Sequence, residues 1–397
     1  MSGLIKARSL SMVPPMAGGG QGLPPLSCLY LVSSFLAMEP TDTVLTYARL
    51  CGGGSVTESV QRFIWDRCLR EAIGKSHAPY LRNFLKKLIS EIELKHGDVL
   101  DELYELLTNS LAYSNEANSL NGNVRALKCI SFLFPEDFYE HQSCSMTNRL
   151  LVSLSCSLNM LEGDTGCSIW PSSLFLAEYI LSYPQIFSKK SCFELGSGVG
   201  LVGICLAHAK ANEVILSDGD LSTLANMKLN LSLNNLNLDD NHEFEYLKSQ
   251  SSVKCLHLPW ESAAETELLA LNPDIILGAD IIYNPSCLPD LVRVLSTLLH
   301  HEKSRSPFED MSSPKEHPVA YISSVIRNTE TFDRFLGLLE AANLAIVDLT
   351  PTCQPLSLLP YMQSYNRSTI RFFMLSGKQN GSQASQSSLK LGCIPAN

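Results

Sequence analysis

The chain has 397 residues, a formal net charge of -10 at pH 7, 45% hydrophobic residues and 18% charged residues. This apolar content excludes a wholly disordered chain, and the length predicts a large catalytic unit with a smaller partner. The acidic balance argues against direct binding of nucleic acid through its phosphates. None of the 13 cysteines forms a Cys-x-x-Cys pair. This favours buried thiols over a metal site and indicates a reducing compartment such as the cytoplasm.

Residues 1–43 are expected to form a disordered leader outside the folded units. Up to Ala37 the chain contains two basic residues, no acid, two Pro-Pro pairs and a triple glycine. Its apolar patch from Leu26 to Ala37 is interrupted by serines and is too short for a membrane span. Two interpretations stay open, an organelle-targeting peptide or an upstream extension ahead of an alternative start at Met38, and we prefer the extension.

Residues 44–125 are predicted to form an all-helical N-terminal unit. Apolar residues recur at helical spacing between Val56 and His96. A further helix is expected over Asp98–Leu111, where leucines make one face and acidic residues suit the N-terminal turn. The segment Tyr113–Asn123, rich in Ser, Asn and Gly, then predicts a linker.

Residues 126–378 are predicted to form an α/β domain, followed by a low-complexity, disordered tail at 379–397. A strand or hairpin is expected at Leu150–Met160. Later strands are expected at Cys192–Leu195, Glu213–Ser217, Asp274–Leu277 and Pro318–Ser324, and helices at Leu201–Ala209, Leu221–Leu233, Leu288–Leu299 and Thr331–Ala342. This alternation predicts a mainly parallel sheet covered on both faces.

A glycine-rich loop connects the first strand and helix of that alternation. Glycines allow a sharp turn and close approach of a ligand, and the following helix presents free N–H groups. Leu201 stands where a dinucleotide fingerprint needs its third glycine. The carboxylate of Glu194, just ahead of the loop, would repel a dinucleotide pyrophosphate. The loop therefore favours S-adenosylmethionine over NAD. Its candidate cofactor-binding residues are Glu194, Gly196, Ser197, Gly198 and Gly200.

Asp218 closes the next predicted strand. An acidic residue at this position in such folds accepts hydrogen bonds from ribose hydroxyls, so we assign Asp218 to the cofactor. Asp220 is the alternative, although it could equally cap the helix that begins near Ser222. Trp170 and Trp260 are candidate flat walls for adenine or methionine, and core packing is the alternative for both.

The segment Gly278–Pro285 follows a predicted strand, at the sheet edge where open α/β folds bind ligands. Asp280 is a candidate for positioning a substrate amine. Tyr283 could wall a lysine channel and stabilise a developing methylammonium by cation–π attraction. The alternatives are that Asp280 only caps a helix and Tyr283 only fills the core. Methyl transfer needs alignment, and burial favours the neutral lysine, so a catalytic base is not strictly required.

These motifs together resemble those of the seven-stranded protein lysine methyltransferases. The resemblance rests on Thr165-Gly166, Trp170, Leu176-Ala177-Glu178-Tyr179, the loop Glu194 to Gly200, Leu216-Ser217-Asp218, Trp260 and Asp280-Ile281-Ile282-Tyr283. Two further segments are similar to the narrower group of elongation factor 2 lysine methyltransferases, the FAM-eighty-six group. They are Leu100-Asp101-Glu102-Leu103-Tyr104-Glu105 and Val325-Ile326-Arg327-Asn328-Thr329-Glu330-Thr331.

The resemblance implies a Rossmann-like, seven-stranded class I methyltransferase sheet, S-adenosyl-L-methionine as cofactor, and a lysine of translation elongation factor 2 as substrate. It implies that Trp170, Gly196 to Gly198, Trp260 and Ala279 contact the cofactor. Two alternatives stay open. A nucleic-acid methyltransferase is disfavoured by the acidic balance and by Ile281-Ile282 in place of a Pro-Pro pair. A cofactor-binding protein that transfers no methyl group is the other.

Overall fold

The structure is a computed structural model. It describes residues 26–70, 78–112, 125–135, 149–158, 165–236, 251–301, 317–362 and 364–378. The chain divides into two compact units. Unit 1 consists of Met1–Gly122, Ala126–Ser131 and Pro360–Ser364, and unit 2 consists of Asn123–Arg125, Phe132–Leu359 and Tyr365–Asn397.

Unit 1 is built mainly from helices. They are α1 (Leu26–Leu36), α2 (Thr41–Cys51), α3 (Glu58–Ile64) continued by a π-helix (Trp65–Leu69), α5 (Ala78–Leu94) and α6 (Asp101–Ala112). Helical spacing places Leu85 and Leu88 of α5 in the interior. Phe35 of α1 packs edge-on against Phe84, with ring centroids 5.1 Å apart. The helices predicted between Val56 and Leu111 are confirmed.

The expectation that residues 1–43 stand outside the fold is wrong for residues 26–43. Helix α1 and the start of α2 lie there, and Leu31 is fully buried. The serines that interrupt the apolar patch do not prevent a helix, and the hydroxyl of one of them, Ser34, donates to the carbonyl of Leu31 in the preceding turn (3.0 Å). Residues 1–25 and the expected tail at 379–397 lie outside the described residues. Of the helices that the structure describes, none combines the length and the apolar character needed to cross a membrane.

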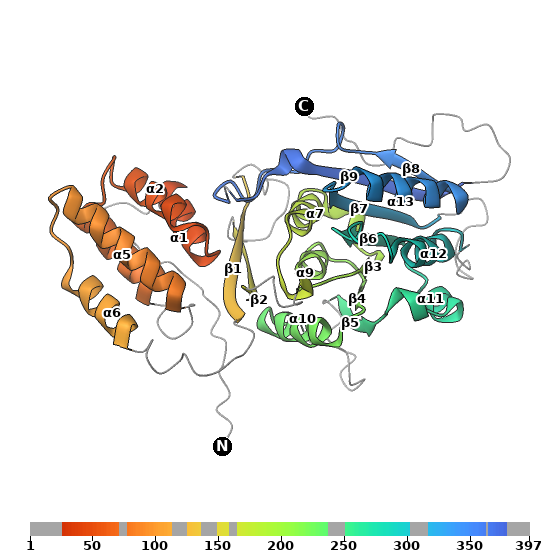
Figure 1. The fold of residues 1–397 in the computed structure, drawn as a ribbon, viewed down its shortest axis with the longest axis horizontal. Helices are drawn as coiled ribbons and strands as arrows, with labels where there is room; N and C mark the ends of the chain where they lie inside the picture. Colours follow the sequence, from red (N-terminus) through yellow and green to blue (C-terminus); the bar gives the residue numbers. More distant parts are fainter. Residues whose placement is uncertain are drawn as a thin grey trace, which may run out of the picture. The chain divides into compact units, whose positions relative to one another are not determined.

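Unit 2 is organised around a seven-stranded sheet with the order β5-β4-β3-β6-β7-β9-β8 (Figure 1). Its strands are β3 (Ser191–Leu195), β4 (Glu213–Asp218), β5 (Ser252–His257), β6 (Ile275–Ala279), β7 (Val319–Val325), β8 (Leu344–Asp348) and β9 (Ile370–Gly377). Strands β3 to β7 are parallel, and β9 is antiparallel to both of its neighbours. The Rossmann-like, seven-stranded fold implied by the family resemblance is confirmed.

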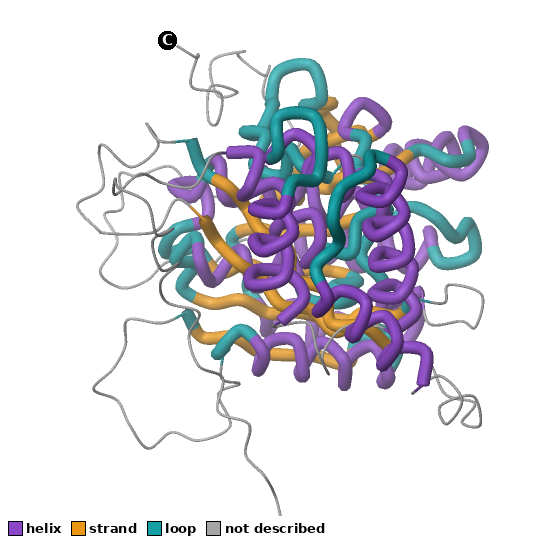
Figure 2. The backbone as a smooth tube through the Cα atoms, turned by 90° about the vertical axis from the view of Figure 1, so that its left-hand side faces the viewer, coloured by secondary structure: helices purple, strands orange, loops and turns teal. Residues whose placement is uncertain are grey.

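Helices cover both faces of this sheet. On one side lie α7 (Pro171–Ser182), α9 (Leu201–His208) and α10 (Leu221–Leu233), and on the other α11 (Glu265–Leu271), α12 (Leu288–Leu299) and α13 (Thr329–Ala341) (Figure 1). The short helix α8 (Pro184–Phe187) follows α7. Figure 2 shows the strands in orange among the purple helices. Strands covered on both faces are continuous apolar runs, such as Ile275-Ile276-Leu277.

Two further strands are β1 (Arg125–Leu133) and β2 (Arg149–Ser157), and β2 confirms the strand expected at Leu150–Met160 over the part that the structure describes. Two asparagine side chains hold β2, that of Asn230 on α10 and that of Asn234 directly after it. Asn234 accepts from the Ser153 N–H (3.0 Å) and donates to its carbonyl (2.8 Å), and Asn230 pairs with Ser155 in the same way (2.7 and 3.2 Å). These two asparagines are therefore structural.

The strand order places the candidate site. Strand β3 pairs with β4 on one side and with β6 on the other, so the chain crosses over in opposite directions from this central strand. Open parallel sheets bind ligands outside the carboxyl ends of the strands at such a switch point. The ends of β3, β4, β6 and β7 share that edge.

Candidate functional site

The glycine loop leaves β3 after Leu195 and enters α9 at Leu201, as predicted. Gly196, Gly198 and Gly200 have φ values of +62°, +53° and +82°, in the left-handed region that favours glycine. A Cβ on Gly198 would lie 3.0 Å from the carbonyl oxygen of Gly166. The loop therefore needs glycine both for its backbone conformation and for its close neighbour.

Glu194 lies inside the sheet just ahead of this loop, paired with Leu216 of β4 and Leu277 of β6. Its side chain is almost fully buried, and its Oε2 atom has no hydrogen-bond partner. Burial raises the pKa of the Glu194 carboxyl to about 8; a hydrogen bond from Ser197 opposes this shift and the negative charge of Asp218 adds to it. A buried carboxyl oxygen without a partner needs an explanation, and beside a glycine loop at the ligand-binding edge a cationic ligand is one that fits.

Asp218 ends β4 and faces the loop. Its Oδ2 accepts from the Gly198 N–H (3.1 Å) and its Oδ1 from the Asp220 N–H (3.1 Å). Burial raises the pKa of Asp218. Each carboxylate oxygen can accept a second hydrogen bond, so the side chain retains capacity for a ligand hydroxyl. Asp220 has the other predicted role, because it caps α10 by accepting from the Thr223 N–H (2.7 Å).

Trp260 and Ala279 stand after β5 and at the end of β6, on opposite sides of β3, the strand from which the loop leaves. Trp260 begins a short 3-10 helix after β5, and its Cζ2 atom lies 3.6 Å from where a Cβ on Gly196 would stand. Arg293 of α12 donates to the carbonyls of Trp260 and of Ala263 (2.8 Å to the latter). Ala279 is the last residue of β6. The structure thus brings Trp260 to the glycine loop, as the sequence interpretation expects.

Trp170 immediately precedes α7, whose first residue is Pro171. The indole N–H of Trp170 donates to the carbonyl of Thr165 (3.1 Å), in a turn whose next residue, Gly166, lies against Gly198. The Arg327 guanidinium carbon stands 5.2 Å from the centre of the Trp170 ring, which is a cation–π distance. The turn that the indole N–H of Trp170 closes therefore meets the glycine loop at Gly166.

Asp280 is buried and pairs with Arg327. Its Oδ1 accepts from Arg327 Nη1 (3.2 Å) and from the Val325 N–H (3.1 Å), and its Oδ2 accepts from Arg327 Nη2 (3.3 Å). The alternative that Asp280 caps a helix is wrong, because α12 begins only at Leu288. Sequence reasoning did not select Arg327 as a site residue, although its position just beyond β7 at the carboxyl edge was a usable signal.

Tyr283 lies in the loop after β6, with 64% of its surface exposed. The alternative that it only fills the core is therefore wrong. An exposed aromatic ring at the ligand-binding edge of the sheet is available to a partner that docks there. Its assignment to the substrate channel stays a prediction.

The residues at this edge fit S-adenosylmethionine. A cationic ligand end would supply the partner that Glu194 Oε2 lacks, and the left-handed glycines leave space beside the backbone. Asp218 offers acceptor capacity for ribose hydroxyls, and Trp260 offers a flat apolar surface beside Gly196. The chemistry of this set differs from that of a pyrophosphate site, where a carboxylate would repel the ligand.

Comparisons with known proteins agree with this assignment. A family described as "Lysine methyltransferase" matches residues 152–309. Human protein-lysine N-methyltransferase EEF2KMT is 28% identical over 291 residues, which cover 71% of this chain and 77% of that protein. An uncharacterized protein of Dictyostelium discoideum is 35% identical over 329 residues, covering 76% and 82%. A solved S-adenosylmethionine-dependent methyltransferase from Agrobacterium tumefaciens is 12% identical with a TM-score of 0.34, covering 57% of this chain and 67% of that one. The chain belongs to the lysine methyltransferase family, whose cofactor is S-adenosylmethionine.

Proposed function

We propose that the protein transfers a methyl group to a lysine side chain of translation elongation factor 2. The main observation in support of methyl transfer from S-adenosylmethionine is the buried carboxyl of Glu194. Its Oε2 has no partner, and it lies beside a left-handed glycine loop at the carboxyl edge of the sheet. Support for the substrate comes from relatives in Homo sapiens, Bos taurus and Mus musculus that carry the name EEF2KMT, at 27–28% identity. The acidic balance of the chain suits a basic protein surface better than nucleic acid.

The cofactor would be held by the residues that the loop gathers. Glu194 would face its cationic methionine end, Gly196, Ser197, Gly198 and Gly200 would leave room for it, and Asp218 would accept from its ribose. Trp170 and Trp260 would form walls, and Ala279 would allow close approach at the end of β6. When bound, S-adenosylmethionine supplies a methyl group made electrophilic by the positive charge on sulfur.

The substrate lysine would enter beside Tyr283. The ordinary pKa of lysine is about 10.4, so the amine is mostly protonated in water, and removal from water favours its neutral, nucleophilic form. The Tyr283 ring would cover the lysine stem and then stabilise the methylammonium product by cation–π attraction. The enzyme's main contribution would be alignment of the amine, which requires no covalent catalysis.

The decisive experiment incubates the purified protein with methyl-labelled S-adenosylmethionine and purified elongation factor 2, and maps the label by mass spectrometry. Calmodulin and total RNA serve as comparison acceptors, because one relative, from Arabidopsis thaliana, is named a calmodulin-lysine N-methyltransferase. We expect label on a lysine of elongation factor 2. Label in RNA would support a nucleic-acid methyltransferase. No label despite measurable cofactor binding would support a non-catalytic binding protein.

Replacement of Tyr283 tests the substrate channel. For Tyr283→Ala we expect a loss of about tenfold in kcat/KM for the protein substrate, since a desolvated cation–π contact contributes about 1–2 kcal/mol. Tyr283→Phe keeps the ring, so its loss should be smaller. Calorimetry should give an unchanged Kd for S-adenosylmethionine in both variants. A large rise in that Kd would instead place Tyr283 in the cofactor wall.

A further inference from the structure

Arg327 joins two candidate site residues that the sequence placed far apart. It lies two residues beyond the end of β7, and its side chain is 45% exposed. One edge of the guanidinium faces both oxygens of Asp280, and the same group stands over the ring of Trp170. Planar, bidentate pairing combined with stacking on an aromatic ring is a geometry that arginine provides and lysine does not.

The hydrogen bonds of Asp280 are made mainly with Arg327. Its side chain is 5% exposed and receives three N–H donors, two from Arg327 and one from Val325. Its backbone has a φ of +56°, and its N–H donates to the carbonyl of Ser323 (2.9 Å). If a lysine amine displaced Arg327, the buried carboxylate of Asp280 would lose its guanidinium partner. Leaving a buried charge without its partner costs free energy.

Trp170 is held on two sides. Its indole N–H is bound to the carbonyl of Thr165, and the face of its ring lies under Arg327. The turn that contains Thr165 and Gly166 reaches the glycine loop, where the Gly166 carbonyl leaves no room for a Cβ on Gly198. A shift of the indole would therefore move this turn and, through Gly166, the glycine loop.

We propose that Arg327 is a positioning residue for the cofactor: clamped by Asp280, it fixes the indole of Trp170, whose own turn meets the glycine loop at Gly166. Asp280 then acts through Arg327 and does not bind the substrate amine. Asp280 also neutralises the guanidinium, so that a cationic cofactor does not meet an unpaired positive charge. This inference rests on the proposed methyl-transfer function.

The test measures the Kd for S-adenosylmethionine by calorimetry, together with kcat and the protein-substrate KM, in Arg327→Ala, Arg327→Lys, Asp280→Asn and the double variant Arg327→Ala with Asp280→Asn. We expect Arg327→Ala to raise the Kd about tenfold, with kcat at saturating cofactor nearly unchanged. Arg327→Lys should recover only part of the loss, because an ammonium lacks the planar fork. Asp280→Asn should raise the Kd similarly, and the double variant should be no worse than Arg327→Ala alone.

Arg371→Ala is the matched control. Arg371 is also half-exposed, also pairs with an aspartate, Asp348, and also lies over an aromatic ring, that of Phe373 at 5.8 Å, but it stands on β9, beyond β7 from the glycine loop. We expect the Kd of the Arg371→Ala variant for S-adenosylmethionine to equal that of the wild type. Tryptophan emission should change on cofactor addition in the wild type and Arg371→Ala, and by a different amount in Arg327→Ala.

Two outcomes would overturn the inference. If Arg327→Ala binds the cofactor like wild type but has a raised KM for the protein substrate, Arg327 contacts the substrate. If Asp280→Asn loses kcat while its Kd is unchanged, Asp280 belongs to the amine site. Calorimetry needs no methyl acceptor, so a failure to methylate elongation factor 2 would refute the proposed substrate and leave this measurement intact.

Discussion

The carboxyl of Glu194 is uncharged in most molecules of the free protein at neutral pH, because burial raises its pKa to about 8. Its Oε2 atom has no partner, and only Asp218, itself acidic, contributes a nearby charge to the shift. A cationic ligand would reverse this balance, since it stabilises the carboxylate. Binding would then release a proton.

We therefore predict that affinity for S-adenosylmethionine rises with pH, by up to about tenfold per unit below about pH 8, and levels off above it. Calorimetry in buffers of different ionisation enthalpy would count the released proton. Glu194→Gln should bind more weakly with no such pH dependence. Glu213→Gln, at the opposite end of β4 where Glu213 pairs with Lys254 (2.7 Å), is the control and should behave like wild type. Proton uptake or no exchange in the wild type would contradict the prediction.

The raised pKa of Glu194 also makes the free energy of unfolding depend on pH. The folded protein holds a proton on Glu194 up to about pH 8, whereas the unfolded chain loses it near the ordinary value of 4.5. Stability from this group should therefore be full below about pH 4.5 and fall as pH rises to about 8. Glu194→Gln should flatten this part of the profile in thermal unfolding.

Gly198 offers a second test at the residue scale. For Gly198→Ala we expect a loss of cofactor affinity of at least about tenfold, because a side chain at φ +53° is strained and its Cβ would lie 3.0 Å from the Gly166 carbonyl oxygen. Gly337→Ala in α13 is the matched control, since a Cβ there meets nothing within 4 Å. The control should bind normally and gain up to about 1 kcal/mol of stability. Wild-type affinity in Gly198→Ala would refute the placement of the ligand.

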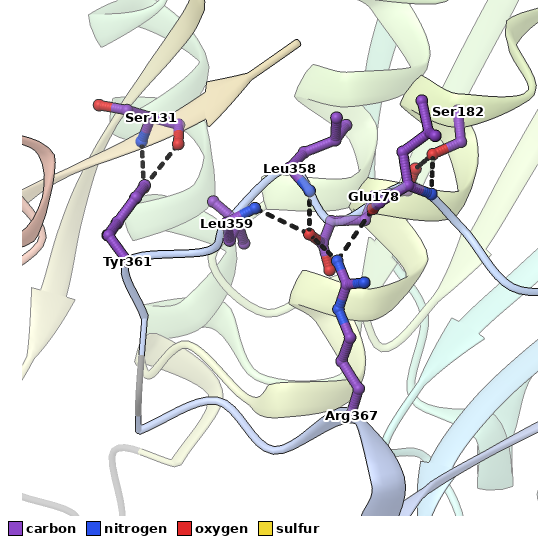
Figure 3. Close-up of polar contacts among 8 residues, drawn as sticks. Ser131, Glu178, Ser182, Leu358, Leu359, Tyr361 and Arg367 are labelled. Carbon is purple, nitrogen blue, oxygen red and sulfur yellow. Dashed lines mark hydrogen bonds and ion pairs between the residues drawn. The ribbon is translucent and has the colours of Figure 1, made fainter. Parts of the chain in front are cut away.

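Helix α7 and the connection from β8 to β9 are held together by Glu178 (Figure 3). This fully buried carboxylate accepts from the N–H groups of Leu358 (2.8 Å) and Leu359 (3.0 Å) and from the guanidinium of Arg367. Burial raises its pKa, although Arg367 opposes this. Ser182, one turn later on α7, accepts from the Leu356 N–H (2.9 Å). One face of the helix thus satisfies the polar backbone of a segment without regular structure.

For Glu178→Ala we predict a loss of about 3–5 kcal/mol in the free energy of unfolding, measured with urea, because two N–H groups and a guanidinium lose their acceptor. Ser182→Ala removes only one acceptor and should cost about 1 kcal/mol. Equal losses in the two variants would show that Glu178 is not the main anchor of this segment.

The sequence predicted those elements whose burial leaves a clear pattern. Strand β6 is an unbroken apolar run, whereas β5 was missed because it lies at the sheet edge and exposes Lys254. Strands β8 and β9 were missed because only a short 3-10 helix (Arg367–Thr369) lies between them in the described residues, so the strand–helix alternation ends at α13. The glycine loop was found because its residues are consecutive. The contacts of Arg327 with Trp170 and Asp280 were not found, because these three residues come from distant parts of the chain.

At the scale of the whole molecule, the two units interleave in sequence. Pro360–Ser364 belongs to unit 1, although the residues before and after it belong to unit 2. Within unit 1, the Ser364 hydroxyl donates to the buried Glu39 side chain (2.6 Å), whose residue lies between α1 and α2. The Tyr361 hydroxyl accepts from the Ser131 N–H (2.8 Å) and donates to its carbonyl (2.6 Å) (Figure 3).

We predict that Glu39→Ala destabilises unit 1 by about 1–3 kcal/mol, because it removes the acceptor of Ser364 and opens a buried polar site. Calorimetric unfolding should show a transition at lower temperature, and cofactor Kd should be unchanged because every proposed cofactor residue belongs to unit 2. Glu58→Ala, which removes only an exposed pair with Arg62, is the control and should unfold like wild type. A single unshifted transition in Glu39→Ala would contradict the prediction.

The bond between Glu39 and Ser364 also constrains the order of events during synthesis. The N-terminal helices leave the ribosome early, yet one of their partners is added 325 residues after Glu39. Domains commonly fold from the N-terminus as they emerge, but here the first unit must wait, incomplete, while nearly all of the second is translated. The nascent chain should therefore present the apolar surface of its first helices to chaperones for longer than a chain with consecutive domains.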